Sequence, residues 1–305
     1  MMNRGSFPNI MTFDLEDWFH ILDIPDSTRI DRWKSFASRA EIGLRIFLEL
    51  LDHRKVTCTF FILGWMAERH PGLVRLAAES GHEIACHGYA HQLIYNQRRD
   101  LFREDLRKSK QVLENISGMP IAGYRGPGFS ITPDNLWAFD DIAESGFTYD
   151  ATIFSGNHGH GGIPGIPSKP FKLKTLSGLE LEEYPIASVY FGKAKTAFSG
   201  GGYFRLFPRR FIAMCIERQN RQDIPVVSYF HPRDFDPNVP RMKMSFKRLF
   251  KSYVNVGKTV GKLDFVLSRY RFMSISAWRR EVFQQPQEVT IIDFASTGRG
   301  NATSP

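Results

Sequence analysis

Short apolar runs alternate with amphipathic segments along most of this 305-residue chain, and this alternation constrains the fold more than any other feature. The apolar runs predict buried strands, and the segments with apolar residues at helical spacing predict helices. Strands are predicted at residues 9–13, 56–63, 82–85, up to 125, 147–151, 181–186, 225–230 and 271–275, and helices at residues 38–53, 73–78, 99–116 and 133–146. Such alternation indicates parallel βαβ units.

The domain organisation follows from these units. Roughly seven of them, without a Gly-rich dinucleotide-binding fingerprint, favour a barrel over a doubly wound open sheet. We therefore predict an α/β fold of the distorted (β/α)7-type barrel. One domain is expected over residues 1–283, with an irregular Gly/Pro-rich loop at 156–170, and residues 284–305 are expected to be a mostly disordered C-terminal extension. Catalytic groups in such barrels lie at the carboxyl ends of the strands.

Charge and composition limit the partners and the compartment. The formal net charge is +8, and the basic residues crowd the C-terminal half, which suits an anionic membrane surface or glycan. Solvated helix faces are the plainer interpretation, and no nucleic-acid-binding motif is present, so no nucleic-acid partner is expected. Three cysteines, no apolar run of about 18–20 residues and no secretory signal predict a cytoplasmic protein, at most peripheral to the inner membrane face.

Polar clusters follow the predicted strands. His87 and His91 are four residues apart, which in a helical turn places both on one face, within reach of one metal ion. Carboxylates in the segment 14–17 would complete a set of two histidines and one acid, which leaves positions open for water and substrate. The same carboxylates are also typical of a helix N-terminus, and Arg125 alone is typical of a salt-bridged barrel residue.

Five segments together resemble the polysaccharide deacetylases of carbohydrate esterase family 4, which share the NodB-homology fold. The resemblance extends from residue 12 to about residue 272, and the motifs are residues 12–17, 81–91, 124–130, 149–150 and 228–232. Three longer strings, at residues 59–65, 200–206 and 231–237, resemble a narrower subgroup encoded in bacterial exopolysaccharide and exosortase-linked gene clusters. That subgroup has an extra C-terminal region.

The resemblance implies a metal site. Its first motif implies that Asp14 is the catalytic base and that a neighbouring acid binds metal. Because this motif reads Asp-Leu-Glu-Asp here instead of Asp-Asp-Gly, the acid is expected to be Asp17, with Glu16 as the alternative. The second motif implies that His87 and His91 are the other ligands. One divalent ion is expected, with Zn²⁺ as the first candidate and Co²⁺, Fe²⁺ or Ni²⁺ as alternatives.

The remaining motifs imply the catalytic acid and its supports. Arg125 is expected to orient the base, and His231 is expected to protonate the leaving group, oriented by Asp150. Arg233 stands where the family usually has a tryptophan, so the substrate surface near His231 differs from the common pattern.

Four residues are candidate substrate contacts. Tyr89 and Tyr203 have rings that can stack on sugars, with core packing as the alternative. Gly126 and Pro127 come from the third motif of the resemblance.

The set of base, acid and metal ligands suits hydrolysis of an acylated glycan. A divalent ion lowers the pKa of bound water and polarises a carbonyl, while the base and acid move protons. The expected activity is removal of N-acetyl or O-acetyl groups from a glycan, in exopolysaccharide or cell-surface polysaccharide synthesis, on a substrate attached to a lipid carrier. The alternatives are hydrolysis of a small amide or cyclic amide, and a catalytically silent glycan-binding protein.

Overall fold

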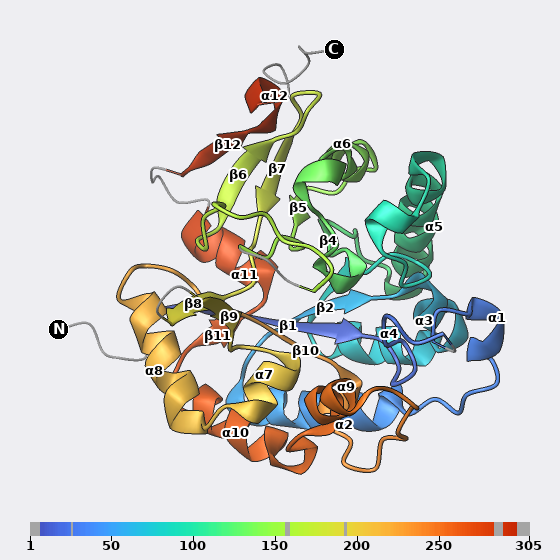
Figure 1. The fold of residues 1–305 in the computed structure, drawn as a ribbon, viewed down its shortest axis with the longest axis vertical. Coiled ribbons are helices and arrows are strands. Elements are labelled where there is room, and N and C mark those ends of the chain that lie inside the picture. Colours follow the sequence, from blue (N-terminus) through green and yellow to red (C-terminus); the bar gives the residue numbers. More distant parts are fainter. Residues whose placement is uncertain (1–6, 26, 156–158, 192–193, 284–288, 298–305) are drawn as a thin grey trace.

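The computed structural model of the chain describes residues 7–25, 27–155, 159–191, 194–283 and 289–297 (Figure 1). Within these residues a mostly parallel sheet has the strand order β10-β1-β2-β3-β4-β5-β7-β6-β12, and β11 pairs with β1. The strands are β1 (Asn9–Leu15), β2 (Thr59–Ile62), β3 (Glu83–Cys86), β4 (Gly123–Tyr124), β5 (Tyr149–Asp150), β6 (Phe171–Lys174), β7 (Glu180–Glu183), β8 (Ser188–Phe191), β9 (Ala194–Ala197), β10 (Val227–Phe230), β11 (Phe272–Met273) and β12 (Ile291–Asp293). The predicted α/β fold with a mostly parallel sheet is confirmed.

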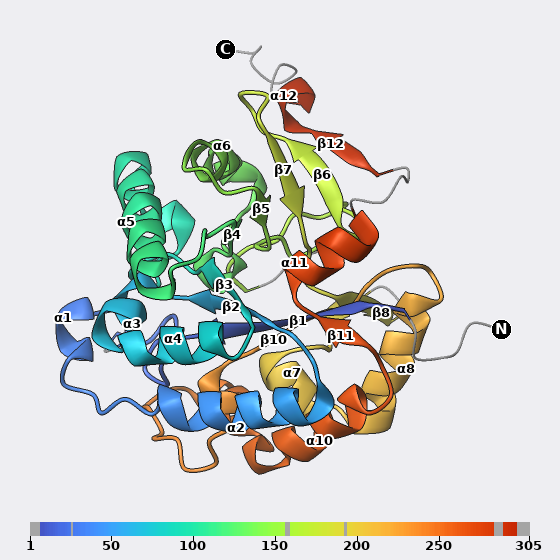
Figure 2. The same cartoon turned by 180° about the vertical axis from the view of Figure 1, so that it is seen from behind.

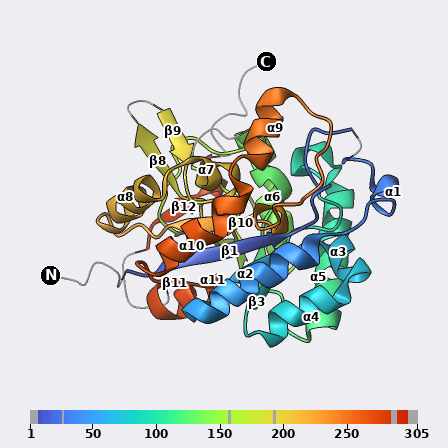
Figure 3. The same ribbon diagram turned by 90° about the horizontal axis from the view of Figure 1, so that it is seen from below.

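Helices cover the outside of the sheet, and Figures 2 and 3 show α2 and α10 side by side along β1. The helices are α1 (Ile30–Trp33), α2 (Ala40–Arg54), α3 (Gly64–Arg69), α4 (Pro71–Glu79), α5 (Arg99–Ser117), α6 (Trp137–Glu144), α7 (Gly201–Leu206), α8 (Arg209–Asn220), α9 (Phe246–Tyr253), α10 (Thr259–Leu267), α11 (Ile275–Trp278) and α12 (Phe294–Thr297). The buried face of α2 stacks Phe47 on Phe13 of β1 at 4.5 Å between ring centroids. Gly43 on the same helix allows a close approach to the turn after β10, because a Cβ there would lie 2.0 Å from the Pro232 carbonyl oxygen.

The barrel closes without a full ladder between its two sides. Beyond β7 the chain reaches β10 through a backbone hydrogen bond from Ala187 N–H to the Val227 carbonyl at 3.4 Å, and Gly200 forms an isolated parallel bridge with Tyr229. β6 pairs with β7 in the antiparallel direction and carries β12 on its other edge. The barrel is therefore distorted: among the described residues β7 and β10 form no ladder with each other, and these contacts of Ala187 and Gly200 join the segment after β7 to β10.

The strand register brings the predicted site residues to one end of the sheet. Phe13 of β1 pairs with Phe230 of β10, so Asp14 and His231 are the next residues on adjacent strands. Cys86 of β3 pairs with Tyr124 of β4, and His87 and Arg125 follow in the same way. Because these strands are parallel, all four side chains lie at the carboxyl edge.

Several elements differ from the sequence-based prediction. β6, the β8–β9 hairpin and β12 were not expected, since short strands at the sheet margin depend on tertiary pairing more than on local sequence. Part of the C-terminal extension expected to be disordered forms β12 and α12, because Phe294 is buried and stacks on Phe139 with ring centroids 5.7 Å apart. Residues 284–288 and 298–305 of that extension lie outside the described residues.

Two further features bear on the environment of the protein. The three cysteines, Cys58, Cys86 and Cys215, are buried and free. In the part of the chain that the structure describes, no helix has the length and apolar character needed to cross a membrane.

Candidate active site

Glu16, His87 and His91 form a group of potential metal ligands at the carboxyl end of the sheet. One ligand atom from each lies within 4.8 Å of the others. His87 Nδ1 lies 2.7 Å from the Arg125 carbonyl oxygen. Because that carbonyl can only accept, Nδ1 carries the proton and Nε2 keeps its lone pair for a ligand. Burial lowers the pKa of His87, which favours the neutral ring that binds metals.

The two histidines meet through an irregular turn and not through the helical turn predicted from their spacing. Residues 87–91 form no helix, and both Gly88 and His91 have left-handed backbones with φ of 72° and 49°. Glycine adopts this conformation without strain, whereas histidine seldom does. The turn brings the two rings to 5.4 Å between centroids.

Asp17, the acid expected to bind metal, lies outside this group. Its carboxylate accepts hydrogen bonds from the backbone N–H groups of Trp18 at 2.8 Å and Arg39 at 3.1 Å, just before α2. Burial outweighs these hydrogen bonds and raises the pKa of Asp17. The acid in the group is the alternative, Glu16, whose buried Oε2 lies 2.7 Å from His91 Nε2. A buried carboxylate oxygen beside two imidazoles suits a cation.

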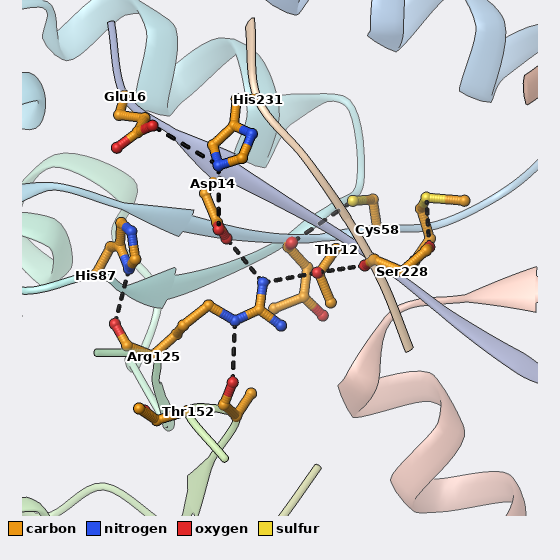
Figure 4. A network of polar contacts seen from close by, with 12 residues as sticks. Thr12, Asp14, Glu16, Cys58, His87, Arg125, Thr152, Ser228 and His231 are labelled. Atoms are coloured by element: carbon orange, nitrogen blue, oxygen red, sulfur yellow. Dashed lines mark hydrogen bonds and ion pairs between the residues drawn. The ribbon is translucent and has the colours of Figure 1, made fainter. Parts of the chain in front are cut away.

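Asp14 and Arg125 form a buried pair beneath the ligand group (Figure 4). The guanidinium donates to Asp14 Oδ1 and to the Thr12 hydroxyl, both at 2.7 Å, and to the Ala151 carbonyl at 3.1 Å. Burial alone would raise the pKa of Asp14, but Arg125, with His87 and His231, outweighs it and lowers that pKa. The Asp14 carboxylate is therefore held ionised in one orientation.

His231 lies above Asp14 and beside Glu16, with its Nε2 3.8 Å from Asp14 Oδ2 and 3.7 Å from Glu16 Oε1 (Figure 4). Its Nδ1 is 3.2 Å from Asp234 Oδ2, which also accepts the His231 backbone N–H at 2.9 Å. Burial first, and then Arg233, lower the pKa of His231 to about 3. The imidazole is thus neutral near pH 7, with its Nδ1–H directed at Asp234 and its Nε2 at the site.

Asp150 does not orient His231, contrary to the prediction. Its carboxylate accepts from the Thr152 hydroxyl at 2.7 Å and from the Thr152 backbone N–H at 2.9 Å. Glu183 lies beside it, and burial together with the Asp150 charge raises the pKa of Glu183 well above its ordinary value. Asp150 therefore belongs to the buried polar layer under Arg125, whereas Asp234 is the residue that contacts His231.

Two arginines that the sequence analysis gave no role in catalysis complete this network. Arg233 contacts Glu16 Oε1, and Arg205 contacts Asp234 Oδ1. Arg205 is buried, and burial lowers its pKa to about 9. The signal that would have found Asp234 is its position three residues after His231, which is itself followed by Pro232; this is the spacing of a capping box.

A cavity of about 300 Å³ opens above these groups. Its walls include Asp14, Glu16, His87, His91 and His231, and also Gly126 among the expected substrate contacts. Tyr89, Pro127 and Tyr203 are not among its lining residues. The Tyr89 hydroxyl donates to Glu68 at 2.6 Å, and the Tyr203 ring packs under the Lys251 ammonium at 4.6 Å.

His20 also lines the cavity, although the sequence analysis did not select it. Its Nδ1 accepts the Asp17 backbone N–H at 2.9 Å, so the neutral ring carries its proton on Nε2. Among the described residues this buried Nε2 has no hydrogen-bond partner. Burial lowers the pKa of His20 well below its ordinary value, so the group is a neutral donor at the edge of the ligand cluster.

Comparison with known proteins gives two family matches. The model described as "Polysaccharide deacetylase" matches residues 44–146, and "Domain of unknown function (DUF3473)" matches residues 151–280. Residues 44–146 are thus similar to polysaccharide deacetylases. His87, His91 and Arg125 come from this deacetylase region, whereas His231 and Asp234 come from the DUF3473 region.

Similar proteins agree with this assignment. A peptidoglycan-N-acetylglucosamine deacetylase of Bacillus cereus is 33% identical over 92 residues, which are 30% of this chain and 34% of that protein. The chain thus matches about a third of the length of this relative.

Solved structures show the fold. A Mycobacterium smegmatis structure assigned to the polysaccharide deacetylases has a TM-score of 0.62 at 21% identity, covering 95% of this chain and 96% of that chain. PuuE allantoinase has a TM-score of 0.61 at 12% identity, covering 92% and 93%. The fold shared with these two structures therefore extends over nearly the whole chain.

Proposed function

We propose that the chain is a metal-dependent hydrolase that removes N-acetyl or O-acetyl groups from a glycan. The observation that carries this proposal is that candidate metal ligands, a candidate general base and a candidate general acid all line one cavity. The ligand group Glu16, His87 and His91 lies beside the ionised Asp14, and His231 Nε2 faces both acids within 3.8 Å. A protein that only binds glycans needs none of these groups.

The residues present fit a divalent cation such as Zn²⁺, with Co²⁺, Fe²⁺ or Ni²⁺ as alternatives. The ligands are one carboxylate and two imidazoles, a set that suits these ions and leaves coordination positions open. We assign Glu16 and not Asp17 as the acid, because Glu16 lies within ligand distance of the histidines, whereas the Asp17 carboxylate accepts backbone N–H groups. A cation bound there supplies Lewis acidity that stabilises negative charge on the acyl oxygen and increases the acidity of water.

Asp14 acts as the general base in this proposal. Its Oδ1 is fixed by Arg125, and its Oδ2 faces the cavity beside His231, where it can accept a proton from the attacking water. Arg125 acts as a positioning residue, since it is fully buried and reaches the reaction only through Asp14 and Thr12.

His231 delivers a proton to the leaving nitrogen as the C–N bond breaks. Because the pKa of His231 is about 3, its Nε2 is unprotonated and must first gain a proton. The source is Asp14, which takes a proton from the attacking water and whose Oδ2 lies 3.8 Å from His231 Nε2. Passing this proton through His231 to the leaving amine balances the reaction, which yields acetate and a free amine. Asp234 holds the Nδ1–H tautomer in place.

The finer assignment concerns the substrate and the compartment. We propose a polymer or lipid-linked saccharide of exopolysaccharide or cell-surface polysaccharide synthesis, processed in the cytoplasm. Buried free cysteines and the net charge of +8 support a reducing compartment and an anionic surface nearby. The DUF3473 region supports a role in substrate processing, since it supplies His231 and Asp234.

Product analysis tests the proposal. Purified protein with added Zn²⁺ is incubated with an N-acetylhexosamine oligomer, an O-acetylated oligomer and allantoin, and both acetate and free amine are measured. Acetate with an equal amount of amine from the N-acetylated oligomer is expected. Turnover of allantoin alone would replace the proposal with cyclic-amide hydrolysis, and binding of the oligomer without acetate would indicate a silent binding protein.

A further inference from the structure

Helix α9 (Phe246–Tyr253) exposes two phenylalanine side chains on one face. Phe246 is 83% exposed and Phe250 is 51% exposed, and residues four apart lie one above the other on a helix. Two neighbouring phenylalanines that expose this much apolar surface to solvent indicate an interaction site.

The opposite face of the same helix forms part of the active-site cavity. Arg248 and Ser252, which are half a turn from the phenylalanines, line that cavity together with Lys251. Arg205 holds the end of the helix by donating to the carbonyls of Lys251 at 2.9 Å and Ser252 at 2.8 Å. Helix α9 therefore lies between the cavity and the exposed phenylalanines.

The chain around α9 is strongly basic. Residues 237–263 contain no Asp or Glu and seven basic residues, which are Arg241, Lys243, Lys247, Arg248, Lys251, Lys258 and Lys262. The side chains of Arg241, Lys243, Lys251 and Lys258 are exposed. Apolar aromatic side chains within a set of cations form the pattern of a helix that lies in the interface of an anionic bilayer.

We propose that α9 docks the protein on an anionic lipid surface, with Phe246 and Phe250 inserted below the headgroups and the surrounding cations on the phosphates. A second copy of the chain is a poorer occupant, because a symmetric contact would bring the same cations together. An uncharged glycan would offer no anionic group to the exposed side chains of Arg241, Lys243, Lys251 and Lys258. Docking on α9 would bring the bilayer to within about one helix diameter, ~10 Å, of the cavity.

Vesicle flotation tests this proposal without any measurement of deacetylation. The intact chain should float with phosphatidylglycerol/phosphatidylcholine vesicles at low salt and stay in solution with pure phosphatidylcholine vesicles or with high salt. The double variant Phe246→Ser/Phe250→Ser should bind the anionic vesicles about tenfold or more weakly. The control variant Leu101→Ser/Met214→Ser removes side chains of similar exposure, 50% and 52%, from α5 and α8 and should bind as the parent does.

A second measurement reports insertion directly. The emission of a Phe246→Trp variant should be quenched by brominated acyl chains in anionic vesicles more than the emission of the parent. Equal flotation of the two double variants, or no added quenching, would overturn the assignment of α9. A parent protein that ignores anionic vesicles and whose sedimentation shows a dimer abolished by Phe246→Ser/Phe250→Ser would assign the face to self-association instead. Neither result changes the deacetylase proposal, which depends on acetate release.

Discussion

Glu16 Oε2 and His91 Nε2 lie 2.7 Å apart, and their side chains are only 2% and 8% exposed. A carboxylate oxygen and an imidazole nitrogen at this separation can both direct lone pairs at one cation. His87 adds a third such atom, since its Nδ1 proton is directed at the Arg125 carbonyl. The relationship between Glu16 and His91 thus explains why Glu16, and not its neighbour Asp17, is the acid assigned to the metal.

Replacing Glu16 by glutamine should remove the metal and the activity together. The amide keeps the shape of the side chain but loses the negative charge that a divalent cation requires. We expect metal content, measured by plasma mass spectrometry after dialysis, to fall from about one ion per chain to near zero for Glu16→Gln.

Asp17→Asn is the matched control for this prediction. It makes the same chemical change one residue away, where the carboxylate accepts backbone N–H groups before α2. Metal content should be unchanged, and the free energy of unfolding should fall by about 1 kcal/mol or less. Loss of metal from Asp17→Asn with retention in Glu16→Gln would reverse the assignment.

The pairing of Asp234 with His231 predicts a positioning role that can be separated from that of Asp150. Asp234→Asn should lower kcat by roughly 10²-fold or more, because the amide no longer fixes the Nδ1–H tautomer. Metal content should stay at the parent level. The pH profile of kcat should also change, which a purely structural defect would not cause.

Asp150→Asn is the comparison for Asp234→Asn. Because Asp150 contacts Thr152 and not His231, its replacement should lower stability while leaving the shape of the pH profile unchanged. An altered pH profile for Asp150→Asn and an unaltered one for Asp234→Asn would contradict the geometry.

Asp14→Asn should abolish turnover while the metal stays bound. Proton transfer by a general base contributes about 10²–10⁴-fold to the rate, and the amide cannot accept the proton. Acetate release and metal content measured on the same sample check this prediction. A variant with normal acetate release would exclude Asp14 as the base, and a variant without metal would indicate that Asp14 is a ligand instead.

His82 predicts a pH-dependent stability that is unrelated to catalysis. Burial lowers the pKa of His82 to about 4, whereas an unfolded histidine has a pKa near 6.5. The unfolded state therefore binds more protons between these values, and stability is lost as the pH falls from 6.5 toward 4. Relative to His82→Asn, the parent should lose about 2–3 kcal/mol between pH 7 and pH 4.5 in urea unfolding. If the free energy of unfolding changes with pH equally in the parent and in His82→Asn, the assigned role of His82 is wrong.

The parts of the site that follow strands could be predicted from the sequence. Asp14, His87, Arg125 and His231 each come one residue after a buried strand residue, and parallel pairing brings those positions to one edge. The parallel α/β fold was predictable for the same reason, since its strands are continuous apolar runs. The hydrophobic pattern therefore predicts which residues lie at the ends of strands, but it does not predict which side chains they contact.

Contacts between distant segments could not be predicted in this way. Asp17 accepts a hydrogen bond from the backbone N–H of Arg39, 22 residues later. The Asp-Leu-Glu-Asp string does not reveal this contact, so the sequence alone does not distinguish Asp17 from Glu16 as the metal-binding acid. The His91 backbone is left-handed, so His87 and His91 lie close together through an irregular turn and not through the helical turn that their spacing predicts. β12 pairs with the edge of β6, and Phe294 after it stacks on Phe139. Neither contact can be predicted from residues 289–297 alone.

The most direct test of the account is a metal titration of chelator-treated protein with acetate release measured at each point. We predict that chelated protein releases no acetate from an N-acetylhexosamine oligomer, and that activity rises with added Zn²⁺ and saturates at one ion per chain. The Glu16→Gln and His87→Ala variants should show neither binding nor activity under the same conditions. Full acetate release by metal-free protein, or saturation that is unchanged in Glu16→Gln, would contradict the proposed site.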